Sequence, residues 1–560
     1  MTKRAFILGL AFVIIQSAIT PYNNFYIQGT KIAGNHFPLG SVLVLLMLTL
    51  GLNTILRRVR PESELSAGEL IVVWMMLVIS SGIPGMGLMQ FLFPVLVVPV
   101  YFATPENEWL EVLHPNLPKW LVVWDKMAVM NFYEGDESVP WLVWLKPLCA
   151  WFAFALVLYF VTICLCVILR KQWVERERYT FPLVQVPLDV VERPNPPALL
   201  NSFFRSKLVL IGILLPFVVH LINGLHRYFP AVPELPLRVD LYKPFTEKPW
   251  YVMRWWPPLR LFLYFSVIGV TYLLTLEVSF SCWFFFLLYK VQYIIIAAFS
   301  LSINPWVSAS RQVMGGYLVL LGGMLWVSRA HLLSVLKKAF ALNDAVDDSE
   351  EPLSYRWAVF GLIFGFVALL VMCSIAGMSL WVAFGVIVAV FIISTVLTWM
   401  VINGGLLLVQ APLFPSEYLE IPLGTRILGP DNVTLFAYQR IHLRDWGEFF
   451  MPSVMHGFKV TDAVELNRRR LLGAMGVAVI VAIGVACYVS LSLIYSKGAL
   501  NMQHWTYVNA PRGYFQHISS LLQYPRTTQW NDVYSMLIGG GVMFLLLFLR
   551  RTFIWWPLHP

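Results

Sequence analysis

Three ionisable side chains lie in sequence that is apolar enough to sit inside a membrane. Glu277, Lys290 and Arg311 fall in the segment 260–311, where two membrane-length apolar runs are joined by the polar sequence TLEVSFS. A charge near the centre of a bilayer costs about 2.5–3.5 kcal/mol, so such residues normally face a bundle interior or a wet cavity. We therefore expect these three residues to mark a substrate or ion pathway.

An alternative interpretation places Glu277 and Arg311 at helix ends in the headgroup layer and lets Lys290 snorkel toward an interface. The sequence FFFLLY precedes Lys290 and QYIIIAAF follows it, so its side chain would have to extend past several residues. We expect Lys290 in the bundle interior, held by a carboxylate or several carbonyls, with Glu277 as its ionic partner. On one continuous helix the two would lie about 20 Å apart, so this pairing requires the TLEVSFS break to fold Glu277 back.

The composition is typical of a helical membrane protein. Of the 560 residues, 58% are hydrophobic and 13% are charged, whereas soluble domains carry about 25% charged residues. Many apolar runs reach the ~18 residues that cross a bilayer, and runs such as VLVLLMLTLGL do not alternate as the strands of a membrane barrel do. The predicted fold is an all-α, polytopic transmembrane bundle of about 12 spans with broken or re-entrant helices.

Lysine and arginine clusters predict the orientation of these spans. The net charge of +9 is spread over loops, which indicates membrane topology rather than a nucleic-acid partner. Both termini are predicted to be cytoplasmic, in a bacterial cytoplasmic membrane, with large external loops at 104–145 and 226–259 and a long cytoplasmic stretch at 403–470. The chain divides into halves at 1–280 and 281–560, with spans near 5–20, 39–56, 69–103, 147–169, 208–225, 261–276, 282–300, 313–328, 357–374, 379–402, 471–495 and 533–549.

One span contains a helix-breaking sequence. The segment 69–103 holds SSGIPGMG, and its glycines and Pro84 cannot continue a regular helix. The charge pattern requires an odd number of crossings here, met by one broken span or by one span plus a re-entrant half-helix. We expect a non-helical kink near Gly82–Gly87 inside the protein, and Gln90 just after it is a pathway candidate.

A short internal echo favours a six-plus-six repeat. Leu183–Leu188 reads LVQVPL and Leu408–Leu413 reads LVQAPL, each after a span that ends inside. Parallel repeats of this kind occur in transporters. Gln185 and Gln410 would then line a cavity on proline-broken segments, or the two segments would be equivalent cytoplasmic elbows that pack the loops. Two asparagines complete the pathway candidates, Asn304 before Pro305 and Asn403 at a second break over 403–415.

Motifs for catalysis were not found. The sequence contains no GxxxxGK[ST], HExxH or GxSxG, so we expect neither an enzyme nor a cofactor or metal site. The six cysteines are interpreted as free thiols and the singly spaced histidines as ordinary surface residues. Asp445 and Glu448 in LRDWGEFF have the spacing of one helix face and are interpreted as cap or salt-bridge residues of a cytoplasmic helix.

Three longer stretches resemble a family. WVERERYTFPLVQVPLD, GVTYLLTLEVSFSCWFFFLLYK and the closing FIWWPLHP are similar to segments of a poorly characterised bacterial membrane family, itself distantly similar to the oligopeptide transporter (OPT) superfamily. The resemblance implies a multi-span transporter of peptides or metal chelates built from duplicated halves.

The favoured function is secondary, ion-gradient-driven transport of a small organic solute through a central polar cavity. The alternative is a non-transporting membrane scaffold subunit of a larger complex, and a membrane enzyme acting on a lipid-linked substrate lacks any motif. Expected partners are the lipid bilayer, a small-molecule substrate, and either a second copy or other membrane subunits. A cavity reaching mid-membrane would favour transport, whereas a packed core with an apolar lateral face would favour the scaffold.

Overall fold

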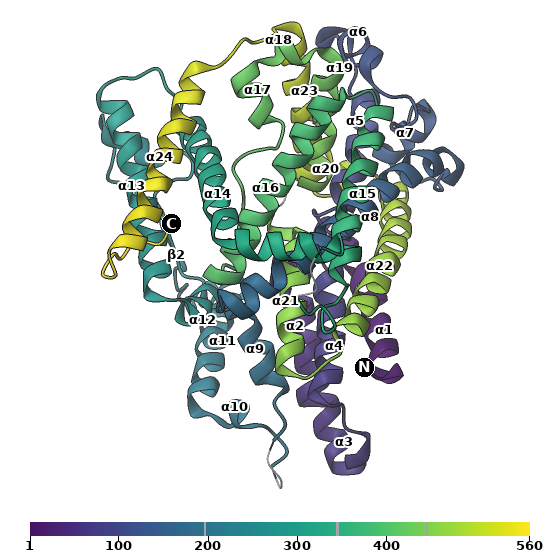
Figure 1. Ribbon diagram of the computed structural model, residues 1–560, viewed down its shortest axis with the longest axis vertical. Helices are drawn as coiled ribbons and strands as arrows, with labels where there is room; N and C mark the ends of the chain where they lie inside the picture. The colour runs from purple at the N-terminus through teal and green to yellow at the C-terminus, as the bar shows by residue number, and fades with distance from the viewer. Residues whose placement is uncertain (195–197, 343–345, 444–445) are drawn as a thin grey trace.

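Helices make up nearly all of the regular secondary structure, as the composition predicts. The computed structural model describes residues 1–194, 198–342, 346–443 and 446–560 (Figure 1). In the described residues, β1 (Arg238–Val239) and β2 (Leu261–Phe262) form one short antiparallel ribbon. The helices of the protein include α1 (Lys3–Pro21), α2 (Leu39–Leu46), α3 (Asn53–Val59), α8 (Trp141–Arg170), α9 (Pro182–Val191), α11 (Lys207–Tyr228), α13 (Leu276–Ala298), α14 (Pro305–Ala339), α15 (Tyr355–Ile375), α16 (Leu380–Gly404), α22 (Arg468–Lys497), α23 (Ala510–Gln523) and α24 (Trp530–Thr552).

Eleven helical segments of the described chain are long and apolar enough to cross a membrane. Each exceeds the ~18 residues needed for the hydrocarbon layer. The protein is therefore a multi-pass membrane protein. The segments are Lys3–Tyr26, Leu39–Val59, Pro61–Ser80, Trp141–Arg176, Lys207–Tyr228, Leu276–Ala298, Pro305–Ala339, Tyr355–Ile375, Leu380–Gly404, Arg468–Lys497 and Trp530–Thr552.

The span expected at 261–276 is not a membrane-length helix. Its first residues pair as β2 with β1, which leaves only the nine-residue helix α12 (Phe265–Leu273). Nine residues rise about 14 Å, less than half of a bilayer core. The polar sequence TLEVSFS, expected to be a break, instead begins α13, with Thr275 as its N-cap.

The kink predicted in 69–103 is confirmed. α4 (Ala67–Ser80) ends at an eight-residue turn, 81–88, and α5 (Met89–Tyr101) begins directly after it. α4 lies in the lower half of the molecule in Figure 1 and α5 in the upper half. Nearly every residue of both helices and of the turn is buried, so the irregular backbone is enclosed by protein.

The stretch 403–470 was expected as a cytoplasmic connector, and much of it lies inside the bundle. Short helices follow one another here: α17 (Glu417–Leu423), α18 (Thr425–Leu428), α19 (Pro430–Leu435), α20 (Arg440–Leu443) and α21 (Phe450–Ala463). α20 packs against α5, and α21 packs against α4, α8 and α16. The hydropathy of the sequence did not indicate that this stretch lies inside the bundle, because proline and glycine divide it into helices too short to resemble a membrane span.

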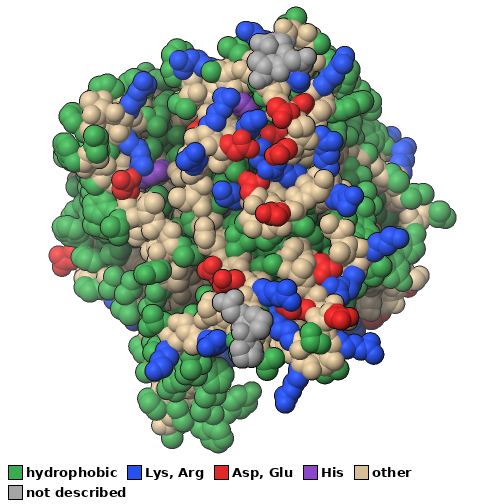
Figure 2. All heavy atoms as spheres, turned by 60° about the horizontal axis from the view of Figure 1, so that its bottom comes forward, with side chains coloured by type: hydrophobic (Ala, Val, Ile, Leu, Met, Phe, Trp, Pro, Cys, Tyr) green, Lys and Arg blue, Asp and Glu red, His purple; other side chains and the backbone are tan. Residues whose placement is uncertain are grey.

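Charged side chains gather at one end of the molecule. Figure 2 shows this end, with lysine, arginine and acidic residues in the middle and hydrophobic side chains around them. Arg170, at the end of α8, holds Glu351 through two contacts of 2.6 Å, and both side chains are almost fully buried. Arg468 pairs nearby with Asp462 at 2.7 Å.

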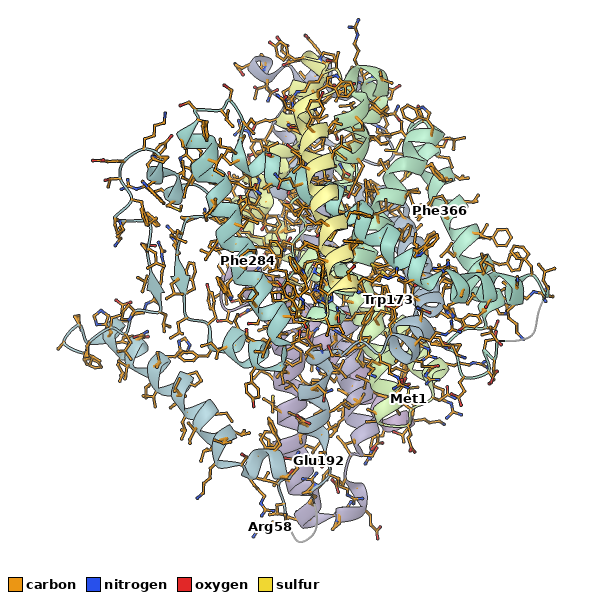
Figure 3. The ribbon with its side chains drawn as sticks, turned by 60° about the vertical axis from the view of Figure 1, so that its left-hand side comes forward. Met1, Arg58, Trp173, Glu192, Phe284 and Phe366 are labelled. Atoms are coloured by element: carbon orange, nitrogen blue, oxygen red, sulfur yellow. The ribbon has the colours of Figure 1, made fainter. Side chains whose placement is uncertain are left out.

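α11 differs from the other long helices. None of its residues is buried, and Figure 3 shows it standing away from the main bundle. Since its sequence is apolar along most of its length, the structure leaves this helix to contact lipid or another protein.

Candidate functional site

The turn of the broken helix α4–α5 and the segment just before α21 meet at Glu448. Its side chain lies against the 81–88 turn, and the Gly87 N–H donates a hydrogen bond to Glu448 Oε2 at 2.9 Å. A Cβ atom added at Gly34 or Gly85 would overlap the carboxylate, and one at Gly82 would lie 2.6 Å from the Glu448 carbonyl oxygen. Only glycine permits this approach, so the helix-breaking sequence has a second role as a cradle for the carboxylate.

Two helix N-termini flank the same carboxylate. α5 begins two residues after Gly87, and α21 begins two residues after Glu448. The first N–H groups of a helix carry partial positive charge and are natural partners for an anionic oxygen. The crossing leaves only about 10 Å³ of free space, so in this conformation it is packed shut.

Gln90, a predicted pathway residue, links several segments at this crossing through hydrogen bonds. It is fully buried, and its Nε2 donates to the Pro84 carbonyl at 2.8 Å and to Ser490 Oγ at 3.2 Å. Its Oε1 accepts a hydrogen bond from the Tyr507 hydroxyl. Each of its polar atoms is thus satisfied by protein, which ties the turn to α22 and to the segment before α23.

Two histidines are buried beside the crossing. His36, in the loop that carries Gly34, is 2% exposed, and His456 on α21 is 1% exposed. Burial, together with the neighbouring His456, lowers the pKa of His36 to about 3. The Nε2 atoms of both rings have no hydrogen-bond partner among the described residues. The interpretation of these histidines as surface residues was wrong, because a long-range packing contact buries them.

A second polar cluster surrounds Arg311. This guanidinium contacts Glu417 on α17 at 2.9 Å and Asp532 on α24 at 3.3 Å, and all three side chains are 13–19% exposed. Burial raises the pKa of nearby Glu420, and Glu417 raises it further. α14 and α24 are held close at this level, since a Cβ atom at Gly315 would overlap the Met536 carbonyl. The cluster joins α17 to the α14–α24 pair.

A cavity of about 460 Å³ lies between α13, α14, α16 and α24. Its polar wall includes the amides of Gln292 and Gln312, which lie 3.2 Å apart. Asn403, a predicted pathway residue, lines it too and lies 3.3 Å from His559 Nε2. The rest of the wall is mainly apolar, and the volume falls in the range of small-molecule sites.

Lys290 and Glu277 do not pair. The Lys290 ammonium donates to the carbonyls of Trp255 and Pro257 and lies 4.7 Å from the centre of the Tyr293 ring, while Glu277 contacts Arg550 at 2.9 Å. Both residues belong to the continuous helix α13, which keeps them far apart. Lys290 is 2% exposed and held by carbonyls as expected, but those carbonyls come from the loop 226–259, so it anchors that loop.

The other predicted pathway residues lie at separate places. Asn304 is exposed and caps α14 by accepting from the N–H groups of Trp306 and Val307. Gln185 and Gln410 are also exposed. The LVQVPL segment is helical within α9, whereas LVQAPL has no regular structure, so the echo does not reflect a common local conformation.

Comparison with known proteins assigns a family to this arrangement. The model of DUF6785, a family of unknown function, matches residues 1–560. The chain belongs to the DUF6785 family. No curated protein matches the sequence.

At the crossing of this DUF6785 chain, Glu448, His36 and His456 are titratable side chains that sequence reasoning did not select as site residues. Glu448 was interpreted as a cap or salt-bridge residue of a cytoplasmic helix, and the structure shows that its carboxylate accepts a hydrogen bond from the turn between α4 and α5. Asp445, the other residue of that interpretation, lies outside the described residues. The usable signal was the glycine content of GNH at 34–36 and of SSGIPGMG, which permits close backbone approach.

Proposed function

We propose that this chain is a secondary transporter that moves a small organic solute across a bacterial cytoplasmic membrane, driven by an ion gradient, with both termini cytoplasmic. The observation that carries the proposal is the contact of Glu448 with the turn of the α4–α5 helix. Irregular backbone at membrane depth is tolerated where it is enclosed by protein or lines a cavity. Transporters place substrate and ion sites at such discontinuous helices.

Proton coupling follows from the residue types at the crossing. A carboxylate and two buried imidazoles can each bind a proton when water reaches them. Rocking of α21 against α4–α5 would separate Glu448 from Gly87 and admit water to His36 and His456. In the packed conformation His36 and His456 are buried and Glu448 is partly buried, as alternating access requires of a coupling site between its two open states.

The cavity between α13, α14, α16 and α24 is the proposed solute site. Its amides at Gln292, Gln312 and Asn403 can both donate and accept hydrogen bonds, which suits a neutral or zwitterionic solute. It lies close to the crossing, since Thr180 donates to the Asn403 carbonyl and the adjacent Phe181 ring lies 6.1 Å from His456. A peptide-like solute is the class that the resemblance to the OPT superfamily suggests.

The test uses full-length protein in liposomes that contain a pH-sensitive dye, with an external panel of peptides, amino acids, organic acids and metal chelates. We expect at least one class to drive internal acidification. Glu448→Gln should slow this flux at least tenfold, whereas Glu234→Gln, an exposed control, should leave it unchanged. Wild-type flux in Glu448→Gln would contradict the coupling role.

A specific observation favours the scaffold as a second candidate. α11 has no buried residue, so it offers a membrane-length apolar face to a partner. If no solute of the panel drives flux and the chain co-purifies from its native membrane with another integral protein through α11, the scaffold function is supported instead.

A further inference from the structure

A second cavity, distinct from the proposed transport site, lies between α8, α15, α16 and the segment that leads into α20. Its volume is about 120 Å³. The walls are aromatic and aliphatic, with Trp151 and Phe154 from α8, Met372 from α15, Val386 from α16 and Phe436 from the incoming segment. An apolar cavity of about 150 Å³ is known to accept a benzene ring, so this space fits one six-membered ring.

Two polar side chains line this cavity without a partner. The Tyr438 hydroxyl and both ring nitrogens of His442 have no hydrogen bond among the described residues, although the two side chains are only 4% and 6% exposed. Buried polar groups are nearly always paired, because desolvation without a partner is unfavourable. Both rings lie beside Trp151, with centroids 5.6 Å and 6.4 Å from the indole. The Tyr438 hydroxyl and the His442 ring nitrogens are therefore free to hydrogen-bond to a ligand at one wall of the cavity.

The wall chemistry restricts that ligand. Among the described residues that line the cavity there is no Asp, Glu, Lys or Arg, so a charged ligand would find no counter-ion. Ordered water is a poor alternative, because a water molecule needs two to four polar partners and most of this wall is apolar. A ring with an oxygen substituent satisfies both the apolar walls and the polar pair.

Access is from the side of the bundle. The lining residues Phe154, Met372 and Cys373 are half-buried, and they lie where α8 and the end of α15 face each other. Exposed apolar residues on the same turns of α15, such as Val371, would contact lipid. A lipid-soluble compound can reach the cavity through this gap without entering water.

We infer that this cavity binds the oxygen-bearing six-membered ring of a neutral, lipid-soluble compound of the phenol or quinone class. The Tyr438 hydroxyl and a ring nitrogen of His442 hydrogen-bond to its oxygen, and Trp151 packs against its ring.

The test compares 4-propylphenol with propylbenzene, which has the same ring and chain without the hydroxyl, on the purified full chain in one detergent. Binding is measured as Kd and as the ligand-induced rise in Tm. We expect Tyr438→Phe and His442→Phe each to weaken 4-propylphenol binding about fivefold, the usual effect of one lost hydrogen bond, and to leave propylbenzene unchanged. Tyr133→Phe, at a buried tyrosine that is not among the residues lining either cavity, is the matched control and should change neither ligand.

A cavity-filling variant adds an independent arm. Val386→Phe should remove binding of both compounds, and the conservative phenylalanine variants decide the question if it does not fold. A substituted benzoquinone, which only accepts hydrogen bonds, distinguishes the two sources: tighter binding than 4-propylphenol indicates a quinone, and weaker binding a phenol. Equal losses for 4-propylphenol and propylbenzene in the Tyr438 and His442 variants, or no binding to the wild type, would overturn the inference.

Discussion

The crossing at Glu448 and the α13–α14–α24 side of the molecule place their polar groups in opposite ways. At the crossing, Glu448 approaches backbone at glycines and leaves about 10 Å³ of space. On the other side, Lys290 extends to carbonyls of a loop and Arg311 contacts side chains of neighbouring helices, and a separate cavity of about 460 Å³ lies between α13, α14, α16 and α24. Lys290 and Arg311, the charges that stand out in the sequence, thus connect separate elements of the fold. Glu448, in contrast, contacts the backbone of the 81–88 turn directly. This difference predicts that substitutions of glycine will disturb the crossing at Glu448. Removal of charged side chains will instead destabilise the α13–α14–α24 side.

The largest effect is expected for Gly82→Ala. The new methyl group would lie 2.6 Å from the Glu448 carbonyl oxygen, a backbone atom that cannot rotate away. Overpacking of this kind costs about 3 kcal/mol, so the Tm should fall strongly. Gly212→Ala on α11, where a Cβ atom meets nothing within 4 Å, is the control and should be neutral or slightly stabilising.

Gly85→Ala tests the position of the Glu448 carboxylate at the same crossing. Here the added methyl group meets the carboxylate of Glu448, the far end of a flexible side chain that can move. We expect a smaller loss of Tm than for Gly82→Ala but a loss of solute-driven proton flux as large as that of Glu448→Gln. A variant with normal flux would show that the position of the carboxylate does not matter for coupling.

Arg311→Met tests the other side. It leaves Glu417 and Asp532 without their shared cation in a partly buried site, which should cost about 2 kcal/mol after allowance for their exposure. The triple variant with Glu417→Gln and Asp532→Asn should recover most of the Tm. If the triple variant is as unstable as Arg311→Met, the loss comes from packing and not from unpaired charge.

Lys290→Met should have a modest effect. The ammonium holds carbonyls of the 226–259 loop, so we expect a loss of about 1 kcal/mol and faster proteolysis of that loop. Transport should persist, because Lys290 contacts the loop and does not line the proposed solute cavity. Loss of solute flux in a normally expressed variant would show that Lys290 is needed for transport.

The smallest expected effect is a pH dependence from His36. Its pKa is about 3 in the folded protein against 6.5 when unfolded, so the unfolded state binds the extra proton. The stability due to neutral His36 is present above pH 6.5 and falls as the pH drops toward 3. Between pH 8 and pH 6 this amounts to about 0.8 kcal/mol. The His36→Phe variant should lack this part of the pH dependence of unfolding, and an unchanged slope would contradict the burial of a neutral imidazole.

Some features of the protein followed from the sequence because they depend on neighbouring residues. Hydropathy over a run of residues indicated the membrane class, and the glycines and proline of SSGIPGMG stop a helix wherever that segment lies. The expected span at 261–276 failed for the complementary reason. A pairing with residues 238–239, outside any local window, takes its first residues into a strand.

The location of the candidate site was decided only by the tertiary structure. Gly87 and Glu448 are 361 residues apart, and their contact exists because α20–α21 folds back between α4–α5, α8 and α16. Lys290 likewise takes its partners from a loop more than thirty residues away, and His36 meets His456 across most of the chain. The sequence determined which segments are apolar and where helices break, since both are local properties. It could not determine which breaks meet, because that depends on the packing of helices distant in the chain.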